Sequence, residues 1–195
     1  MRNKLLDLAA REHSPRRRMA ALIAEGFVFI VGIPLLLVRG SARLDRRLHL
    51  PRLQCGPLNQ VAGALFAVVG WPLAMWAIVT QFTQGRGTPV PVMATQKLLT
   101  QGPYAVCRNP MALGAILAYL GISLWRGSPS AVGAVLLLSA QLLAYIKLGE
   151  EREMVARFGQ EYEAYRRSVP FLIPRLSAAP CEPAPLRAEA AVQRP

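Results

Sequence analysis

Four apolar stretches limit what this chain can fold into. A helix needs about 20 mostly apolar residues to cross the hydrocarbon core of a bilayer. The third stretch has only 15 residues, so at about 1.5 Å per residue it reaches roughly 22 Å, less than the core thickness of ~30 Å. The stretches are residues 19–38, 58–82, 111–125 and 129–148. The sequence therefore predicts an all-α fold, a polytopic integral membrane bundle of about four transmembrane helices.

The spacing of these stretches indicates how the helices are arranged. Only residues 126–128 separate the last two stretches, which predicts an antiparallel helical hairpin at the C-terminal side of the bundle. Small residues recur on the second and third stretches, and this spacing lets helix backbones approach closely in lipid. These small residues are Gly63, Ala67 and Gly70 on the second stretch and Gly114, Ala118 and Gly121 on the third.

Composition supports the membrane assignment. Hydrophobic residues make up 53% of the 195 residues and charged residues only 17%, against about 25% charged in soluble domains. The net charge of +12 requires anionic surroundings, and the Arg residues bracket the apolar stretches instead of forming one stripe with aromatics. We therefore expect the lipid bilayer, and no nucleic acid, as a partner.

The distribution of Lys and Arg predicts the orientation. With both termini inside, four spans place 17 cations in the cytoplasm and 6 outside, as the positive-inside rule requires. The exception is a cluster of five Arg between residues 39 and 56, which leaves a re-entrant first segment as the alternative. We expect a multi-pass protein with its site facing the cytoplasm. The short chain and its preference for Arg over Lys suggest a bacterial inner membrane.

Cysteine and histidine usage excludes several classes of site. Three Cys without a C-x-x-C pair and two His residues, His13 and His49, support neither a disulfide framework nor a zinc site. We expect free thiols and no metal. Hydrolases that need an imidazole as general base are also disfavoured.

The first polar segment that could carry chemistry is 102–110, directly before the third stretch. Pro110 suits the first turn of a helix, so Arg108 and Asn109 would lie at a helix N-terminus, where free backbone N–H groups can hold an anion. The alternative is that Arg108 is an interfacial anchor and Asn109 a helix cap.

The second polar segment follows the fourth stretch and contains Glu150 and Glu151. Adjacent carboxylates on a helix point about 100° apart, so only one can face a given pocket. The alternative is a solvated face on which Glu153 and Arg157 pair across one turn. Gly159 is a plausible helix stop.

Aromatic residues follow this segment. Tyr162 and Tyr165 share a helix face, with Arg166 alongside. By themselves they could equally form an amphipathic interfacial helix with aromatic anchors.

These elements together resemble a family of membrane methyltransferases, over roughly residues 95–174. The family includes isoprenylcysteine carboxyl methyltransferase and the phospholipid N-methyltransferases. Gly-Pro-Tyr at 102–104 followed by Arg-Asn-Pro at 108–110 and Gly114 is similar to its G-P-Y and R-H-P-x-Y-x-G elements. The pairs 150–151, 158–159, 169–170 and 173–174 and the tyrosines 162 and 165 match its later elements in order. Two positions depart from the pattern: Asn109 replaces a common His, and Ala112 replaces a Tyr.

The resemblance implies S-adenosylmethionine as methyl donor and a lipophilic acceptor. A prenylcysteine carboxylate, a phospholipid amine or a thiol would be methylated; the sequence fixes neither the acceptor nor the oligomeric state. The implied cofactor-binding residues are Tyr104, Arg108, Asn109, Pro110, Gly114, Glu150 and Glu151. The implied catalytic residues are Tyr165 and Arg166, near the acceptor.

On this basis the chain divides into four parts. Residues 1–18 form a basic cytoplasmic segment, 19–94 two spans with their loops, 95–175 the methyltransferase core, and 176–195 a disordered tail. Two other functions remain open: an NADPH-dependent reductase of the related membrane superfamily, and a membrane scaffold that has lost activity.

Overall fold

The computed structural model is all-helical over the residues that it describes, 14–53, 56–85 and 95–174. The predicted tail at 176–195 and most of the basic segment at 1–18 lie outside these residues. In chain order the helical elements are α2 (Pro15–Phe27), η1 (Val28–Gly32), α3 (Ile33–Arg47), α4 (Leu58–Thr83), α5 (Pro103–Val106), α6 (Pro110–Arg126), α7 (Pro129–Tyr145), η3 (Ile146–Glu150) and α8 (Glu151–Ser168). The predicted fold class is confirmed.

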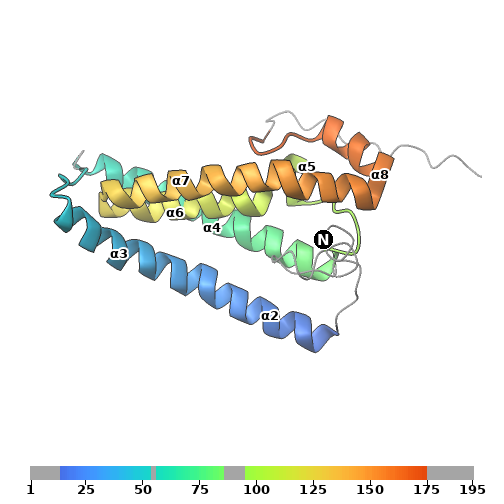
Figure 1. Cartoon of the computed structure of the whole chain (residues 1–195), viewed down its shortest axis with the longest axis horizontal. Helices are drawn as coiled ribbons and strands as arrows, with labels where there is room; N and C mark the ends of the chain where they lie inside the picture. The colour runs from blue at the N-terminus through green and yellow to red at the C-terminus, as the bar shows by residue number, and fades with distance from the viewer. Residues whose placement is uncertain (1–13, 54–55, 86–94, 175–195) are drawn as a thin grey trace, which may run out of the picture.

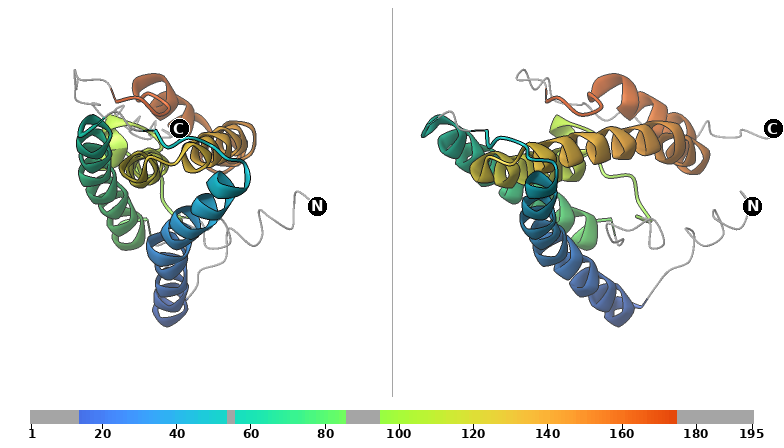
Figure 2. Two further views of the ribbon diagram at one scale, coloured as in Figure 1. Left: turned by 90° about the vertical axis from the view of Figure 1, so that its left-hand side faces the viewer. Right: turned by 60° about the vertical axis from the view of Figure 1, so that its left-hand side comes forward.

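The first apolar stretch lies within one long helix. α2, the π-helical turn η1 and α3 form a continuous helix over Arg16–Arg47, so this part contains no re-entrant turn. Figures 1 and 2 show α3 beside α6 and α7 and α2 diverging from these two helices toward the end of α4. Near the start of α2, the Arg18 guanidinium lies 4.7 Å from the Phe82 ring centroid of α4 and donates to the Phe82 carbonyl.

α4 and α6 form the most extensive interface in the structure. A Cβ on Gly70 would lie 2.4 Å from the Ala118 nitrogen, and one on Gly121 would lie 2.6 Å from the Ala67 nitrogen. Any side chain larger than hydrogen would therefore push the two backbones apart. The predicted close packing through small residues is confirmed.

α6 and α7 form the predicted hairpin. Gly127 ends α6 in the left-handed conformation (φ 61°, ψ 34°), which a side chain would disfavour. Ser128 then caps α7, its Oγ accepting from the Ala131 N–H at 3.3 Å, and Pro129 occupies the first turn. The turn is as short as the sequence predicts because Gly127 ends α6 and Ser128 caps α7 directly after it.

Three helical segments of the described part are long and apolar enough to cross a membrane: Arg16–Arg47, Leu58–Thr83 and Pro129–Ser168. α6 has 17 residues and is shorter, as predicted for the third stretch. Large apolar side chains on the bundle exterior are exposed, such as Leu36, Val68 and Leu137. This distribution fits a lipid environment. The count of four spans stays a prediction.

The last apolar helix continues beyond α7 without interruption through η3 into α8. Gly159 has φ 53° and ψ −128°, which breaks the regular helix where a stop is predicted. α8 and α5 lie near the N-terminal end of α6, while the α6–α7 turn lies at the opposite end of the bundle (Figure 1).

Candidate functional site

Three segments that are distant in the sequence meet beside the start of α6. The backbone N–H of Arg108 donates to the Pro170 carbonyl at 2.9 Å, so residues 107–109 and 169–171 lie side by side. The start of α8 contributes Glu151 to the same place. We call this set the Arg108 cluster; its members are Arg108, Asn109, Glu151, Tyr162 and Tyr165.

Arg108 is the centre of the cluster. Its Nη1 pairs with Glu151 Oε1 and donates to the Tyr162 hydroxyl at 3.3 Å, and its Nε donates to the Val169 carbonyl at 3.1 Å. The Arg108 and Glu151 side chains are only 10% and 7% exposed. Each buried charge therefore depends on the other. The alternative of Arg108 as an interfacial anchor does not hold.

The π-helical turn η3 determines which of the two adjacent carboxylates faces Arg108. Such a turn adds a residue to one helical turn and rotates the residues after it, and it occurs frequently at functional sites. Glu151, directly after η3, is buried, whereas Glu150 is half-buried. As the sequence predicts, only one of the two carboxylates faces the cluster.

Two further charged groups lie near Glu151. Arg166 is half-exposed, and its Nε lies 3.8 Å from Glu151 Oε2. Glu153 instead pairs with Arg157 at 3.4 Å across one helical turn, so the pairing expected from their spacing is confirmed, but the side chains are only 33% and 14% exposed and do not form a solvated face.

The two tyrosines of α8 pack inward. Their ring centroids are 6.1 Å apart, and both rings are buried together with Val169. The Tyr165 hydroxyl donates to the Tyr104 carbonyl at 2.7 Å, and this hydrogen bond connects α8 to α5. The interfacial-anchor interpretation of these rings is therefore wrong.

The remaining predicted residues lie on or beside α6. Asn109 Nδ2 donates to the Phe171 carbonyl at 2.9 Å, and its side chain does not cap the helix. Pro110 is buried in the first turn, as predicted. Gly114 lies against α4, where a Cβ would be 2.5 Å from the Ala74 nitrogen. Gly114 thus packs two helices together, and its cofactor-binding role stays a prediction.

Two weakly acidic groups of the α5 segment are held in their neutral forms. Burial, and secondarily the nearby Cys107, raise the pKa of the Tyr104 phenol. Burial likewise raises the pKa of the Cys107 thiol, partly offset by the backbone N–H of Asn109. Neither group ionises near neutral pH, so the charges of the site come from Arg108, Glu151 and Arg166.

Sequence reasoning missed the carbonyl groups that orient Arg108 and Asn109. Val169, Pro170 and Phe171 supply them. The Val-Pro pair at 169–170 was visible as part of a motif, but a motif does not reveal that its backbone oxygens are acceptors. In the part of the chain described, no group of three His, Cys, Asp or Glu residues could hold a metal ion.

Comparison with known proteins identifies relatives over the same region. Residues 58–161 match the family model described as phospholipid methyltransferase. The chain is 37% identical over 100 residues to methanethiol S-methyltransferase 2 of Bradyrhizobium diazoefficiens, covering 50% of this chain and 35% of that protein. It is 36% identical over 80 residues to the cobalt-zinc-cadmium resistance protein CzcN of Cupriavidus metallidurans, covering 41% and 37% of the two chains.

The aligned region therefore spans little more than a third of the length of these curated relatives. The family model, in contrast, matches more than half of this chain, and the matched region includes α4, α6, α7 and most of α8. The matched region contains both the apolar helices and the adjacent carboxylates Glu150 and Glu151, and the resemblance of the motifs around Arg108 agrees with this match. This chain belongs to the phospholipid methyltransferase family of membrane proteins.

Proposed function

We propose that the chain transfers a methyl group from S-adenosylmethionine to an acceptor that reaches the site from the bilayer. The observation that carries this proposal is the Arg108–Glu151 ion pair. It joins two family motifs that are 43 residues apart in the sequence, at the end of an apolar bundle.

The donor set of the cluster fits S-adenosylmethionine. The amino-acid end of this molecule carries one carboxylate and one ammonium group, and the cluster holds one guanidinium and one carboxylate. On binding, Arg108 would exchange Glu151 for the ligand carboxylate, and Glu151 would accept from the ligand ammonium. Both buried charges would stay paired, which avoids the penalty for an isolated buried ion.

The roles proposed for the other residues follow from where they lie relative to the Arg108–Glu151 pair. Glu150, half-buried beside Glu151, is proposed to accept from the ribose hydroxyls. The segment from Tyr104 to Pro110 would line the rest of the donor site, with Gly114 behind it. Asn109 would act through its amide, held by the Phe171 carbonyl. An amide does not titrate near neutral pH, so no proton transfer is assigned to it.

Tyr165 and Arg166 differ in what they can contact. The Tyr165 ring is buried and its hydroxyl is bonded to Tyr104, so we assign it a positioning role for α5. Arg166 is half-exposed beside Glu151 and is the better group to contact the head of an acceptor.

The reaction requires alignment more than acid–base chemistry. When bound, S-adenosylmethionine would supply an electrophilic methyl carbon; as the acceptor atom bonds to this carbon, the carbon–sulfur bond would break, S-adenosylhomocysteine would leave, and any acceptor proton would go to solvent. Holding the two reactants in line supplies most of the rate. Prenylcysteine carboxylates, phospholipid amines and thiols are all eligible acceptors. The name of the Bradyrhizobium relative makes small thiols the first to test.

The test has a binding arm and a transfer arm. We expect S-adenosylhomocysteine to raise the melting temperature of the purified chain, because a ligand held only by the native state stabilises it. Glu151→Gln should weaken this binding about tenfold or more, since it removes a charged hydrogen-bond partner. Glu153→Gln is the matched control and should bind as the native chain does.

In the transfer arm, labelled methyl groups should appear in small thiols or membrane lipids only when the protein is present. Stabilisation by NADPH in place of S-adenosylhomocysteine would favour the reductase alternative. Binding of S-adenosylhomocysteine without transfer to any thiol, lipid or prenylcysteine analogue would favour the inactive scaffold.

A further inference from the structure

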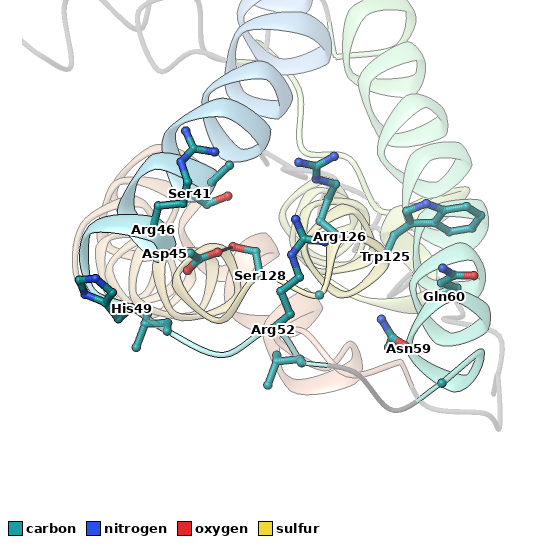
Figure 3. Close-up of a pocket in the computed structure, with 15 residues that line it drawn as sticks. Ser41, Asp45, Arg46, His49, Arg52, Asn59, Gln60, Trp125, Arg126 and Ser128 are labelled. Atoms are coloured by element: carbon teal, nitrogen blue, oxygen red, sulfur yellow. Dashed lines mark hydrogen bonds between the residues drawn. The ribbon is translucent and has the colours of Figure 1, made fainter.

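A basic pocket of about 920 Å³ lies at the end of the bundle opposite the Arg108 cluster. It is formed by the end of α3, the segment after it, the start of α4 and the α6–α7 turn. Three arginines from three different elements line it, namely Arg46, Arg52 and Arg126 (Figure 3). We call it the basic end pocket.

The positive charge of this pocket is only partly neutralised within the described residues, by Asp45, whose charge interacts with Arg52. Its lining contains one carboxylate, Asp45. Asp45 Oδ2 accepts from the Ser128 hydroxyl, and Oδ1 accepts from the Ser130 N–H at 3.1 Å. No ion pair within the described part of the chain involves Arg46, Arg52 or Arg126. Figure 3 shows Asp45 directed toward Ser128 while the Arg46 and Arg126 guanidinium groups point away from it.

The backbone around the pocket is held in place by contacts between its elements. The Leu53 N–H donates to the Gly127 carbonyl at 2.9 Å, and Asn59 Nδ2 donates to the Leu124 carbonyl at 3.2 Å. His49, also in the lining, has φ 51° and is the single non-glycine residue of the described part with a positive φ. Such conformations persist where the surroundings fix them, and they cluster at ligand sites.

The rim of the pocket is apolar. Leu50, Leu53 and Trp125 line it, and all three side chains are exposed. Trp125 is the penultimate residue of α6, and aromatic residues near the ends of membrane helices commonly contact headgroups. A ligand of this pocket thus meets guanidinium groups on one side and apolar side chains on the other.

We propose that the basic end pocket binds the phosphate of an anionic phospholipid headgroup, with the first part of the acyl chains against the Leu50, Leu53 and Trp125 rim. Guanidinium groups match phosphate oxygens in charge and in hydrogen-bond geometry. Free phosphate carries the same charge but has no acyl chains to pack against the apolar rim. The site is separate from the Arg108 cluster, and its occupancy does not depend on methyl transfer.

The test compares lipids that differ only in headgroup charge. The purified full chain in neutral detergent receives phosphatidylglycerol, phosphatidylcholine with the same acyl chains, or inorganic phosphate, and its melting temperature is measured. Phosphatidylglycerol should stabilise the native chain more than phosphatidylcholine, and the difference should shrink as salt is added. Equal stabilisation by both lipids would overturn the proposal, and so would an equal effect of inorganic phosphate.

A matched pair of variants locates the site. Arg52→Gln/Arg126→Gln removes two arginines of the pocket, and Arg43→Gln/Arg47→Gln removes two exposed arginines of α3 that do not line it. The first should bind phosphatidylglycerol about tenfold or more weakly, and the second should bind as the native chain does. Equal losses in both would mean general surface attraction and would refute the site. If the first variant does not fold in phosphatidylcholine, Arg52→Gln alone replaces it.

Discussion

The two ends of this helical bundle use arginine in opposite ways. At one end, Arg108 is buried and paired with Glu151, and Tyr162 and Val169 take further hydrogen bonds. At the other end, the three arginines of the basic end pocket are exposed and have no ion pair within the described residues.

The difference concerns what each end can do with an anion. A buried ion pair can exchange partners with a ligand that brings both charges, because neither charge is then left alone. Exposed arginines attract a single negative charge at little cost of desolvation. The paired end therefore suits a zwitterionic methyl donor, and the open end suits a phosphate.

The strongest test of the paired end is Glu151→Ala. This substitution leaves the Arg108 guanidinium buried without its carboxylate, so we expect it to lower the free energy of unfolding by about 3–5 kcal/mol. Denaturant unfolding in detergent measures this. Glu153→Ala removes an i,i+4 pair in which the Glu153 side chain is 33% exposed, and should cost only about 0.5–1 kcal/mol. Similar losses of unfolding free energy in both variants would contradict the prediction that the buried Arg108–Glu151 pair contributes more to stability than the Glu153–Arg157 pair.

A second test concerns the α4–α6 interface, which runs between the two ends. In Gly121→Ala the new Cβ would lie 2.6 Å from both the Ala67 nitrogen and the Gly63 oxygen. We expect a loss of about 1–3 kcal/mol from forcing the backbones apart. At Gly133 a Cβ meets nothing within 4 Å, so Gly133→Ala should be neutral or slightly stabilising. Unfolding in detergent checks both, and an unaffected Gly121→Ala would contradict the close packing.

A smaller effect is expected from Tyr165→Phe. It removes the hydrogen bond to the Tyr104 carbonyl but keeps the ring, which should cost about 1 kcal/mol. If Tyr165 positions the α5 segment, binding of S-adenosylhomocysteine should weaken as well. Tyr145→Phe, at an exposed position, is the control. Unchanged ligand binding in Tyr165→Phe would remove the positioning role.

The last prediction perturbs the structure least. It uses thiol labelling to compare how accessible cysteine side chains are to solvent at the two ends. Cys107 is 2% exposed, and burial raises the pKa of its thiol, so at pH 8 it should be protonated and react slowly with iodoacetamide. In a Cys55→Ser/Cys181→Ser background, Gln60→Cys at the basic end pocket should react much faster than Cys107. Mass spectrometry follows both positions. Rapid labelling of Cys107 in the folded chain would mean that the Arg108 cluster is open to water.

Much of the fold followed from the sequence because hydrophobic length and small-residue spacing are local signals. The four apolar stretches, the short hairpin turn and the Gly63–Gly121 and Gly70–Gly114 contacts all depend on residues whose size or polarity can be read directly. The break at Gly159 was visible for the same reason. The extent of the first helix was not, because Arg and Ser residues beyond its apolar part continue it to Arg47.

The candidate site was predictable as a set of residues and not as an arrangement. The sequence, with the family resemblance, determined that Arg108, Asn109, Glu151 and Tyr165 belong together. Only the tertiary structure decided that Arg108 pairs with Glu151, that Glu150 ends a π-helical turn and is only half-buried, and that the carbonyls of 169–171 orient the guanidinium and amide. The same holds for the basic end pocket, whose arginines come from three separate elements. The physical reason is that chemical character belongs to each residue, whereas partners are set by how helices pack and where their turns shift register.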